Sequence, residues 1–217
     1  MKQPQAIQAV LGMTLDGLKG NSGCTSMQPS PQSSALSPRL TSQVAAVRKR
    51  YGGIEQFLRT FHVNNQERYT EDADRCYFGT CPTMGLVNTA YGKKTAGEWL
   101  VYQLTDLSEF CGCREKITAM QIEQLAAIIA SDFYFLKLTE MMLFFRKFKK
   151  GDYGRFYGNI DPLIITNALR MFLRERNERI ARRDEEEQQR RDAEARENAI
   201  TWEEYVKNYK KNEDKAI

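Results

Sequence analysis

The stretch that decides the fold is FLKLTEMMLFFRKFKKGDYGRFYGNIDPLIITNALRMFLRERN, residues 135–177. Its first part predicts a helix over residues 138–149, because apolar residues recur there at helical spacing and Gly151 follows as a C-terminal stop. Asp161-Pro162 then joins an N-cap residue to a proline suited to a first helical turn, and so predicts a second helix. The inward positions are Met142, Phe145 and Phe148 in the first helix, and Ile165, Leu169, Phe172 and Leu173 in the second.

Upstream of this stretch, apolar spacing predicts a helix over residues 42–62. Ser42 can cap it, and Gly52-Gly53 breaks or bends it. After the glycines, a buried stripe recurs at helical spacing. Its members are Ile54, Phe57, Leu58 and Phe61. Residues 63–81 are polar and irregular, and we expect no helix there.

Three more helix signals separate this region from residue 135. Pro82 suits a first helical turn, and Gly92 is the matching stop. Two further helices open with a capping box, in which a Ser or Thr precedes a Glu or Gln by three residues. The two boxes are Thr95 with Glu98, and Thr118 with Gln121. Because alternation typical of strands is nearly absent, we predict an all-α fold.

Both ends of the chain differ in composition from the middle. Residues 20–41 are rich in Ser, Pro, Gln and Gly, with too few large apolar groups to offset the entropy of ordering. Beyond Arg174, opposite charges four residues apart predict a solvated helix without an apolar coiled-coil seam. The pairs are Glu178/Arg182, Glu186/Arg190, Glu187/Arg191 and Asp192/Arg196. We therefore predict a disordered tail over 1–41, a compact helical domain over 42–176, and a charged helical arm over 177–217 that ends in a docking helix.

The bulk composition restricts the class of protein. The chain has 217 residues and a net charge of +4, which is only mildly basic for a nucleic-acid-binding domain. No apolar run approaches the roughly 20 residues that span a bilayer, and the residues after Met1 lack a cleavable signal pattern. We expect a soluble cytoplasmic protein with no membrane partner. In that reducing compartment its five cysteines are thiols or metal ligands.

The densest positive charge lies in the turn between the two helices of the opening stretch. Cations neutralise phosphates, aromatic rings stack on unpaired bases, and glycines allow a close backbone approach. The residues that we expect to contact single-stranded DNA are Arg146, Lys147, Lys149, Lys150, Tyr153, Arg155, Phe156 and Tyr157. The alternative is structural: the rings fold back over the helix pair, and the lysines are a solvated helix end that is favourable to the macrodipole.

Four cysteines form two pairs, Cys76 with Cys81 and Cys111 with Cys113. Four thiolates can hold zinc tetrahedrally, and zinc is the one cofactor that the sequence suggests. The spacings C-x4-C and C-x-C depart from the usual C-x2-C, however. They favour small, partly buried thiols near a helix end.

The last helix signal is a third capping box, Thr201 with Glu204. Trp202, Tyr205 and Tyr209 line one face of the helix that follows, together with Val206. At the end of a charged arm, no local segment can bury this face. It either folds back on the domain or docks in a partner's groove, with the three rings as the partner-binding anchors.

No pattern in the sequence predicts a catalytic centre. The single histidine, His62, has no nucleophile or carboxylate at a meaningful spacing, and we expect it to be structural. Lys137 and Glu140, three residues apart, are expected to form a local ion pair. The segment GNSGCTS, residues 20–26, lacks the Gly-Lys-Ser/Thr ending of a phosphate loop. The sequence therefore predicts a protein that is not an enzyme.

Four motifs between residues 76 and 177 carry a resemblance. They are CYFGTCPTMGLVNTAYG, LSEFCGC, FLKLTEMMLFFRKFKKGDYGRFYGNIDP and ALRMFLRERN. On these motifs the chain resembles a family of uncharacterised small proteins encoded in gut-type bacterial genomes and in their prophages or conjugative elements. The family has no established activity, so the resemblance implies none. Its helix-turn-helix centre also loosely resembles small all-α replication accessory proteins of phages, including helicase loaders, although it shares no sequence motif with them.

Two functions are compatible with these patterns. The first is a non-enzymatic, nucleic-acid-associated accessory protein of a mobile element, acting in DNA replication in the manner of a helicase loader. The second is a protein-interaction adaptor that grips a replication or mobile-element protein through the C-terminal arm. The two can coexist, and a small zinc-bound module is a third interpretation.

Overall fold

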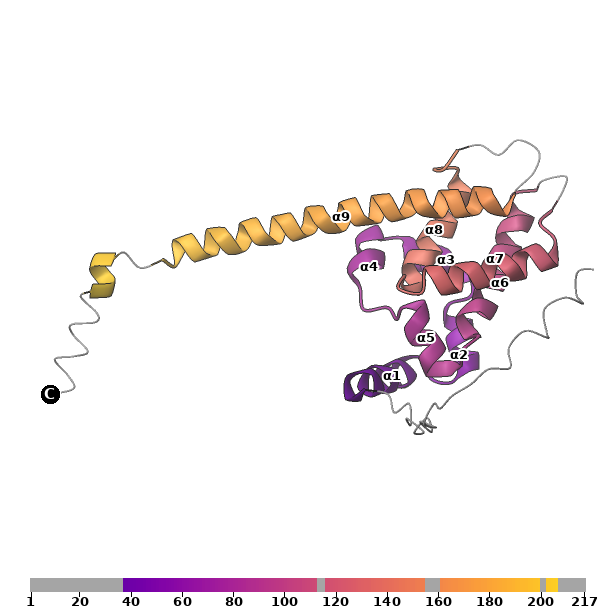
Figure 1. Ribbon diagram of the computed structural model, residues 1–217, viewed down its shortest axis with the longest axis horizontal. Coiled ribbons are helices and arrows are strands. Elements are labelled where there is room, and N and C mark those ends of the chain that lie inside the picture. Colours follow the sequence, from indigo (N-terminus) through magenta and orange to yellow (C-terminus); the bar gives the residue numbers. More distant parts are fainter. Residues whose placement is uncertain (1–36, 113–115, 155–160, 200–201, 207–217) are drawn as a thin grey trace, which may run out of the picture. The chain divides into compact units, whose positions relative to one another are not determined.

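The computed structural model describes residues 37–112, 116–154, 161–199 and 202–206. All of these belong to the second of two units in the chain, Ser37–Ile217. The described residues are helical apart from turns and one isolated antiparallel bridge, so the all-α class is confirmed. In chain order (Figure 1) the helices are α1 (Pro38–Tyr51), α2 (Ile54–Thr60), the 3-10 turn η1 (Val63–Asn65), α3 (Gln66–Thr70), α4 (Ala73–Phe78), α5 (Met84–Tyr91), α6 (Thr95–Phe110), α7 (Ala119–Asp132), α8 (Leu138–Lys150) and α9 (Pro162–Glu197).

The first helix begins earlier than the sequence predicts. Pro38 occupies the first turn of α1, and the hydroxyl of Ser37 accepts a hydrogen bond from the Leu40 N–H at 3.4 Å. The predicted cap at Ser42 is therefore wrong, and residues 38–41 belong to this helix rather than to the predicted tail. Proline already has the φ of a first helical turn, which explains the earlier start. The predicted break is confirmed, because Gly52 has a φ of 71° and ends α1.

The polar segment 63–81, in which the sequence predicts no helix, contains η1, α3 and α4. These elements are too short to show a helical repeat in the sequence. Asp72 caps α4, and its Oδ1 accepts the N–H groups of Asp74 at 2.9 Å and Arg75 at 3.2 Å. Cys76 and Tyr77 are buried where α4 packs on α8. A few buried side chains and one N-cap therefore stabilise the helices of this segment, although its sequence shows no amphipathic periodicity.

The junction between α5 and α6 also differs from the sequence prediction. Gly92 ends α5 as predicted, but Thr83 rather than Pro82 stands at its start. The predicted Thr95/Glu98 capping box is wrong, because Thr95 is already inside α6 and buried. The N–H of the next residue, Ala96, donates to the Asn88 side chain at 2.8 Å. An N–H group at the start of α6 is therefore hydrogen-bonded by a side chain of α5, and not by the predicted capping box within α6.

Helix α8 is the centre of the domain. All of its residues from Leu138 to Phe145 are buried, which is typical of a helix surrounded by protein. It contacts α3, α4, α6 and α9. The predicted inward positions in this helix are buried, and Gly151 ends it with a φ of 85°. The opening stretch of the sequence therefore supplies the helix on which the others pack.

Helix α9 is one uninterrupted element of 36 residues. Asp161 caps it as predicted, with its Oδ1 accepting the Leu163 N–H at 2.8 Å. Three of the four predicted inward residues, Ile165, Leu169 and Phe172, are buried, and the fourth, Leu173, is half-buried. From Ala181 to the last described residue of this stretch, every side chain is exposed except the half-buried Glu187. The helix crosses the predicted boundary at residue 176 without a break and continues past the helical body (Figure 1).

The ion pairs along the second half of α9 differ from those predicted. Arg183 pairs with Glu187 at 3.0 Å, and Arg190 with Glu194 at 3.9 Å. The four-residue spacing is as expected, but the arginine comes first in each pair. Despite its length, α9 is too charged to cross a membrane, and none of the other helices in the described ranges meets that requirement either.

The predicted Thr118/Gln121 capping box is confirmed, and removing it should weaken α7. Each side chain accepts the other residue's backbone N–H, at 3.3 Å for Thr118 Oγ1 and 3.0 Å for Gln121 Oε1. We expect Thr118→Ala to lower the free energy of unfolding by about 1 kcal/mol in urea titrations followed by circular dichroism. Thr105→Ala is the matched control, because Thr105 is exposed within α6 and alanine favours a helix interior. Equal losses in the two variants would contradict the capping role.

Candidate functional site

Two of the cations expected to contact DNA are bound to acceptors within the domain. Arg146 donates to the Glu67 carbonyl at 3.0 Å and to the Thr70 hydroxyl at 3.1 Å. The Glu67 carboxylate lies 3.6 Å from the same guanidinium. The Lys147 ammonium donates to the carboxylate of Glu175 on α9. These two side chains therefore hold α8 to α3 and α9, and their positive charge is largely balanced in place.

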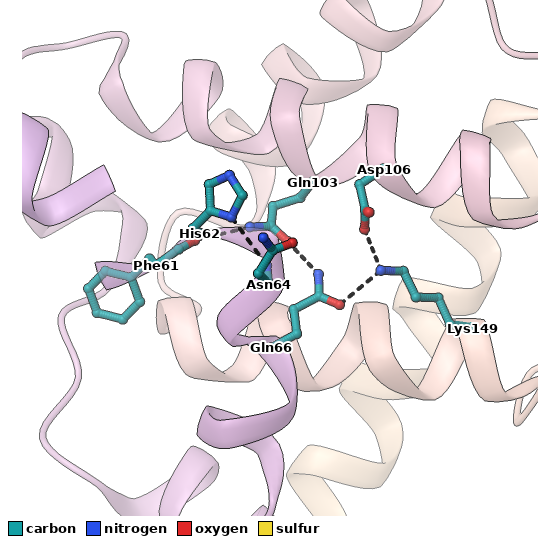
Figure 2. A network of polar contacts seen from close by, with 7 residues as sticks. All are labelled: Phe61, His62, Asn64, Gln66, Gln103, Asp106 and Lys149. Atoms are coloured by element: carbon teal, nitrogen blue, oxygen red, sulfur yellow. Dashed lines mark hydrogen bonds and ion pairs between the residues drawn. The ribbon is translucent and has the colours of Figure 1, made fainter. Parts of the chain in front are cut away.

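Lys149, a third expected contact, belongs to a chain of polar groups that links α8 to α6 and α3 (Figure 2). Its ammonium donates to the Asp106 carboxylate and, at 3.0 Å, to Gln66 Oε1. The Gln66 amide donates to Gln103 Oε1 at 2.5 Å, and the Gln103 amide donates to the Phe61 carbonyl at 3.2 Å. Both glutamines are buried. Lys149 therefore satisfies buried polar groups and is not a solvated helix end.

The remaining residues of the expected DNA contact divide into three groups. The Tyr153 ring packs inward, with its centroid 5.7 Å from that of Phe144 and 6.4 Å from that of Phe148. Burial raises the pKa of Tyr153 well above its usual range. Lys150 is exposed. The other three expected contacts, Arg155, Phe156 and Tyr157, lie outside the described residues. Of the described members of this set, Lys150 is thus the one that faces solvent.

The described cysteines of the alternative zinc site differ in burial and in hydrogen bonding. Cys76 is buried, and its thiol donates to the Tyr69 carbonyl at 3.1 Å. Burial, reinforced by Cys81, raises the pKa of Cys76 to about 12, so this sulfur is a protonated thiol at neutral pH. Cys81 and Cys111 are half-buried, and Cys113 lies outside the described residues. Within the described ranges, no three His, Cys, Asp or Glu side chains gather in an arrangement that could hold a metal ion.

His62 takes the structural role that the sequence predicts. Its Nδ1 accepts the Asn64 N–H at 3.3 Å and so caps η1 (Figure 2). The ring is on the exposed side of the turn.

The predicted ion pair between Lys137 and Glu140 is wrong, because each side chain has another partner. Glu140 is fully buried. Its Oε2 accepts the backbone N–H of Lys137 at 2.8 Å, and its Oε1 accepts the Nε–H of Arg176 at 2.7 Å. The Lys137 ammonium instead donates to the Tyr77 carbonyl at 2.5 Å. Glu140 therefore connects the central helix α8 to α9.

Helix α9 is fastened by three arginines about one turn apart, Arg176, Arg179 and Arg183, which we call the arginine row. Arg179 forms an ion pair of 2.6 Å with Asp74, and this hydrogen bond holds the pKa of that carboxyl below its usual range. The Arg183 guanidinium lies 4.0 Å from the centroid of the Phe78 ring, close enough for a cation–π contact. The row continues the buried face of α9 across α4. It therefore sets the direction in which the rest of the helix extends.

The described aromatic residues at the end of the arm are exposed to solvent. Trp202 is 75% exposed and Tyr205 is 51% exposed, and their rings stack with centroids 5.6 Å apart. Tyr209 and Thr201, the cap of the predicted box, lie outside the described residues. We call residues 202–206 the aromatic segment.

The sequence predictions of the site missed the arginine row. The residues lie at positions 176, 179 and 183, a helical spacing that continues from Phe172. That spacing was a usable signal, but the partners of the row, on α4 and α8, are far away in the sequence.

Comparison with known proteins adds a family match over the second half of the chain. Residues 116–216 match the model of a family described as a family of unknown function (DUF6633). This region contains α7, α8, α9 and the aromatic segment. The resemblance to an uncharacterised family is thereby confirmed, whereas an origin in mobile elements stays a prediction. No curated protein and no solved structure matches the chain.

Removing the Glu140 carboxylate should destabilise the domain strongly. We expect Glu140→Ala to cost about 3–5 kcal/mol of unfolding free energy, because Arg176 would keep a largely buried charge without its partner. Glu187→Ala is the matched control, since it breaks an exposed pair worth less than about 1 kcal/mol. Urea denaturation of both variants measures the difference. Similar small losses would show that Glu140 does not fasten α9.

Contact with single-stranded DNA stays a prediction. Among the described residues that we expected to contact DNA, Lys150 is the exposed one. The hypothesis predicts binding in fluorescence polarisation at low salt that weakens steeply as salt is added. Lys150→Ala should reduce the salt dependence by about one unit of slope. Lys149→Ala should instead lower stability, because Asp106 would lose its partner. A wild-type protein without affinity at low salt would rule the hypothesis out.

Proposed function

We propose that this protein is a non-enzymatic interaction adaptor, in which a helical domain holds a stiff arm and the aromatic segment at the end of the arm binds a partner protein. The observation that carries the proposal is the continuity of α9. Its first half is packed on the domain, its middle is fastened by the arginine row, and its second half is exposed up to Glu197.

The length of α9 keeps Trp202, the first residue of the aromatic segment, beyond the point where α9 last contacts another helix. Arg183 is the last α9 side chain with an ion pair, hydrogen bond or ring contact to another helix. From there to Glu197 the helix advances about 21 Å at its usual rise. The chain from Glu197 to Trp202 spans at most about 18 Å when fully extended. The backbone of Trp202 therefore stays beyond the level of Arg183 in any conformation, and its ring is available to another molecule.

The charge of the exposed arm favours a protein partner over a nucleic acid. Residues 184–197 contain seven carboxylates and three arginines, which gives this stretch a net charge of −4. Phosphates would be repelled by such a surface. Three of the four cations of α8, which we expected to contact phosphates, are bound to acidic or carbonyl oxygens within the domain. For these reasons we rank the adaptor above the nucleic-acid accessory function.

The aromatic segment has the chemistry of a binding anchor. Trp and Tyr are the residue types that most often dominate the energy of protein interfaces, because they bury a large area at a low entropic cost. We propose that the partner is a replication or mobile-element protein in the cytoplasm. The partner would present a groove to the aromatic segment, since an amphipathic helix usually binds in one.

A pull-down of partners with the full chain tests the proposal. The double variant Trp202→Ala/Tyr205→Ala should reduce partner recovery at least tenfold, because it removes the anchors and leaves the domain untouched. Tyr134→Ala is the matched control, since Tyr134 is 58% exposed but lies outside the arm. It should recover partners as the wild type does. Full recovery with the double variant would overturn the adaptor function.

A further inference from the structure

A groove of about 910 Å³ lies between α6 and α7. Its lining includes small residues, Gly97 on α6 and alanines on α7, beside the larger Leu58, Val101 and Tyr102. The alanines are Ala126, Ala127 and Ala130. A Cβ added to Gly97 would meet no atom within 4 Å, so the space above it is open. Two helices with small residues facing one trough can receive the large side chains of a third helix.

The groove has charges of opposite sign at its two ends. Lys93 and Lys94 lie at the end formed by the start of α6. Glu123, near the start of α7, lies at the other end, because Val101 and Glu123 also line a neighbouring pocket together. Between Lys94 and the level of Val101, α6 advances about 11 Å. Glu98, about one turn beyond Lys94 on α6, also lines the groove, so the positive end is followed along α6 by two acidic side chains, Glu98 and Glu123.

We propose that this groove binds the aromatic segment of a second copy of the chain. In sequence, large side chains recur at helical spacing in that segment, at Trp202, Tyr205 and Val206, and again at Tyr209, which follows it outside the described residues. Glu203 and Glu204 precede three lysines, Lys207, Lys210 and Lys211. Docked as a helix parallel to α6, the segment places its glutamates at Lys93 and Lys94. It places its last lysines about 11 Å further on, at Glu123. The proposal rests on the adaptor function, and it assigns a second copy of the chain to the aromatic segment in place of a replication or mobile-element protein.

The occupant must come from another molecule, because the arm prevents a segment from reaching the groove of its own chain. Helix α7, which forms one wall of the groove, contacts α9. Trp202 of the same chain cannot return past the level of Arg183. Two copies that exchange segments would each fill the groove of the other, which is the closed two-fold arrangement most common among homodimers.

The arms themselves carry a pattern that fits two antiparallel copies. Arg183, Glu187, Arg190 and Glu194 are spaced four, three and four residues apart, so they lie on one face of α9. An antiparallel second arm, centred between residues 188 and 189, brings Arg183 opposite Glu194 and Glu187 opposite Arg190. A parallel arm in register would oppose like charges. Exposed pairs contribute little affinity, so this pattern sets the direction of pairing rather than its strength.

The same register carries the end of each arm back over the part of α9 that packs on the other copy's domain, because position 197 of one arm falls opposite position 180 of the other.

Sedimentation equilibrium of the full chain over a range of concentrations tests this inference. We expect a reversible dimer that is weakened at least tenfold by Trp202→Ala/Tyr205→Ala. Gly97→Gln should weaken it to the same degree by filling the groove, and it should keep the fold, because glutamine favours a helix more than glycine does. Tyr134→Ala is the control and should dimerise as the wild type does. A monomer at all concentrations, or a dimer that neither variant weakens, would overturn the proposal.

Charge reversal tests the orientation of the docked segment. Lys93→Glu/Lys94→Glu should weaken the dimer, and adding Glu203→Lys/Glu204→Lys should restore it. A combined variant as weak as the first pair would overturn the proposed direction. If the chain is monomeric while Trp202→Ala/Tyr205→Ala still loses partners in the pull-down, the second copy is the wrong occupant and the adaptor function stands.

Discussion

The structure depends on one buried carboxylate, that of Glu140 on the central helix. A charge taken out of water is very unfavourable unless hydrogen bonds and an opposite charge compensate for it. Here the compensating groups are a backbone N–H at the start of α8 and the guanidinium of Arg176. Because Arg176 must remain at that carboxylate, α9 has one register on the domain. The position and direction of everything beyond Arg176 follow from this constraint.

The charged residues have different roles in the domain and in the arm. In the domain, three of the four cations of α8 bind carboxylates and carbonyls and so hold helices together. Along the arm, charges face water, and acidic residues outnumber basic ones beyond Arg183. Residues 1–183 carry 25 basic and 17 acidic side chains, so the net charge of +4 for the whole chain combines a basic stretch up to Arg183 with an acidic projection beyond it. The acidic charge of the projection is why we propose a protein, rather than a phosphate-bearing molecule, as the partner of its tip.

Local signals in the sequence predicted the long elements, while contacts between distant residues decided the site. Gly151, Asp161-Pro162 and the Thr118/Gln121 box act within a few residues and were predicted correctly. Helices α3 and α4 were missed because five or six residues cannot show a period. The role of Lys149 was missed for another reason. Its acceptor Gln66 is 83 residues away in sequence, and no local pattern connects the two.

The unbroken length of α9 has a mechanical consequence. Its 36 residues contain no glycine and no proline after the first turn, so it has none of the usual causes of a kink. A helix held along its first half and unsupported along its second half is a lever. A tilt of about 10° at Arg183 would displace Glu197 by roughly 4 Å, given the rise of the helix. Small rearrangements where the helix rests on α4 and α8 are thereby amplified at its tip, and a pull on the tip is transmitted back to the core.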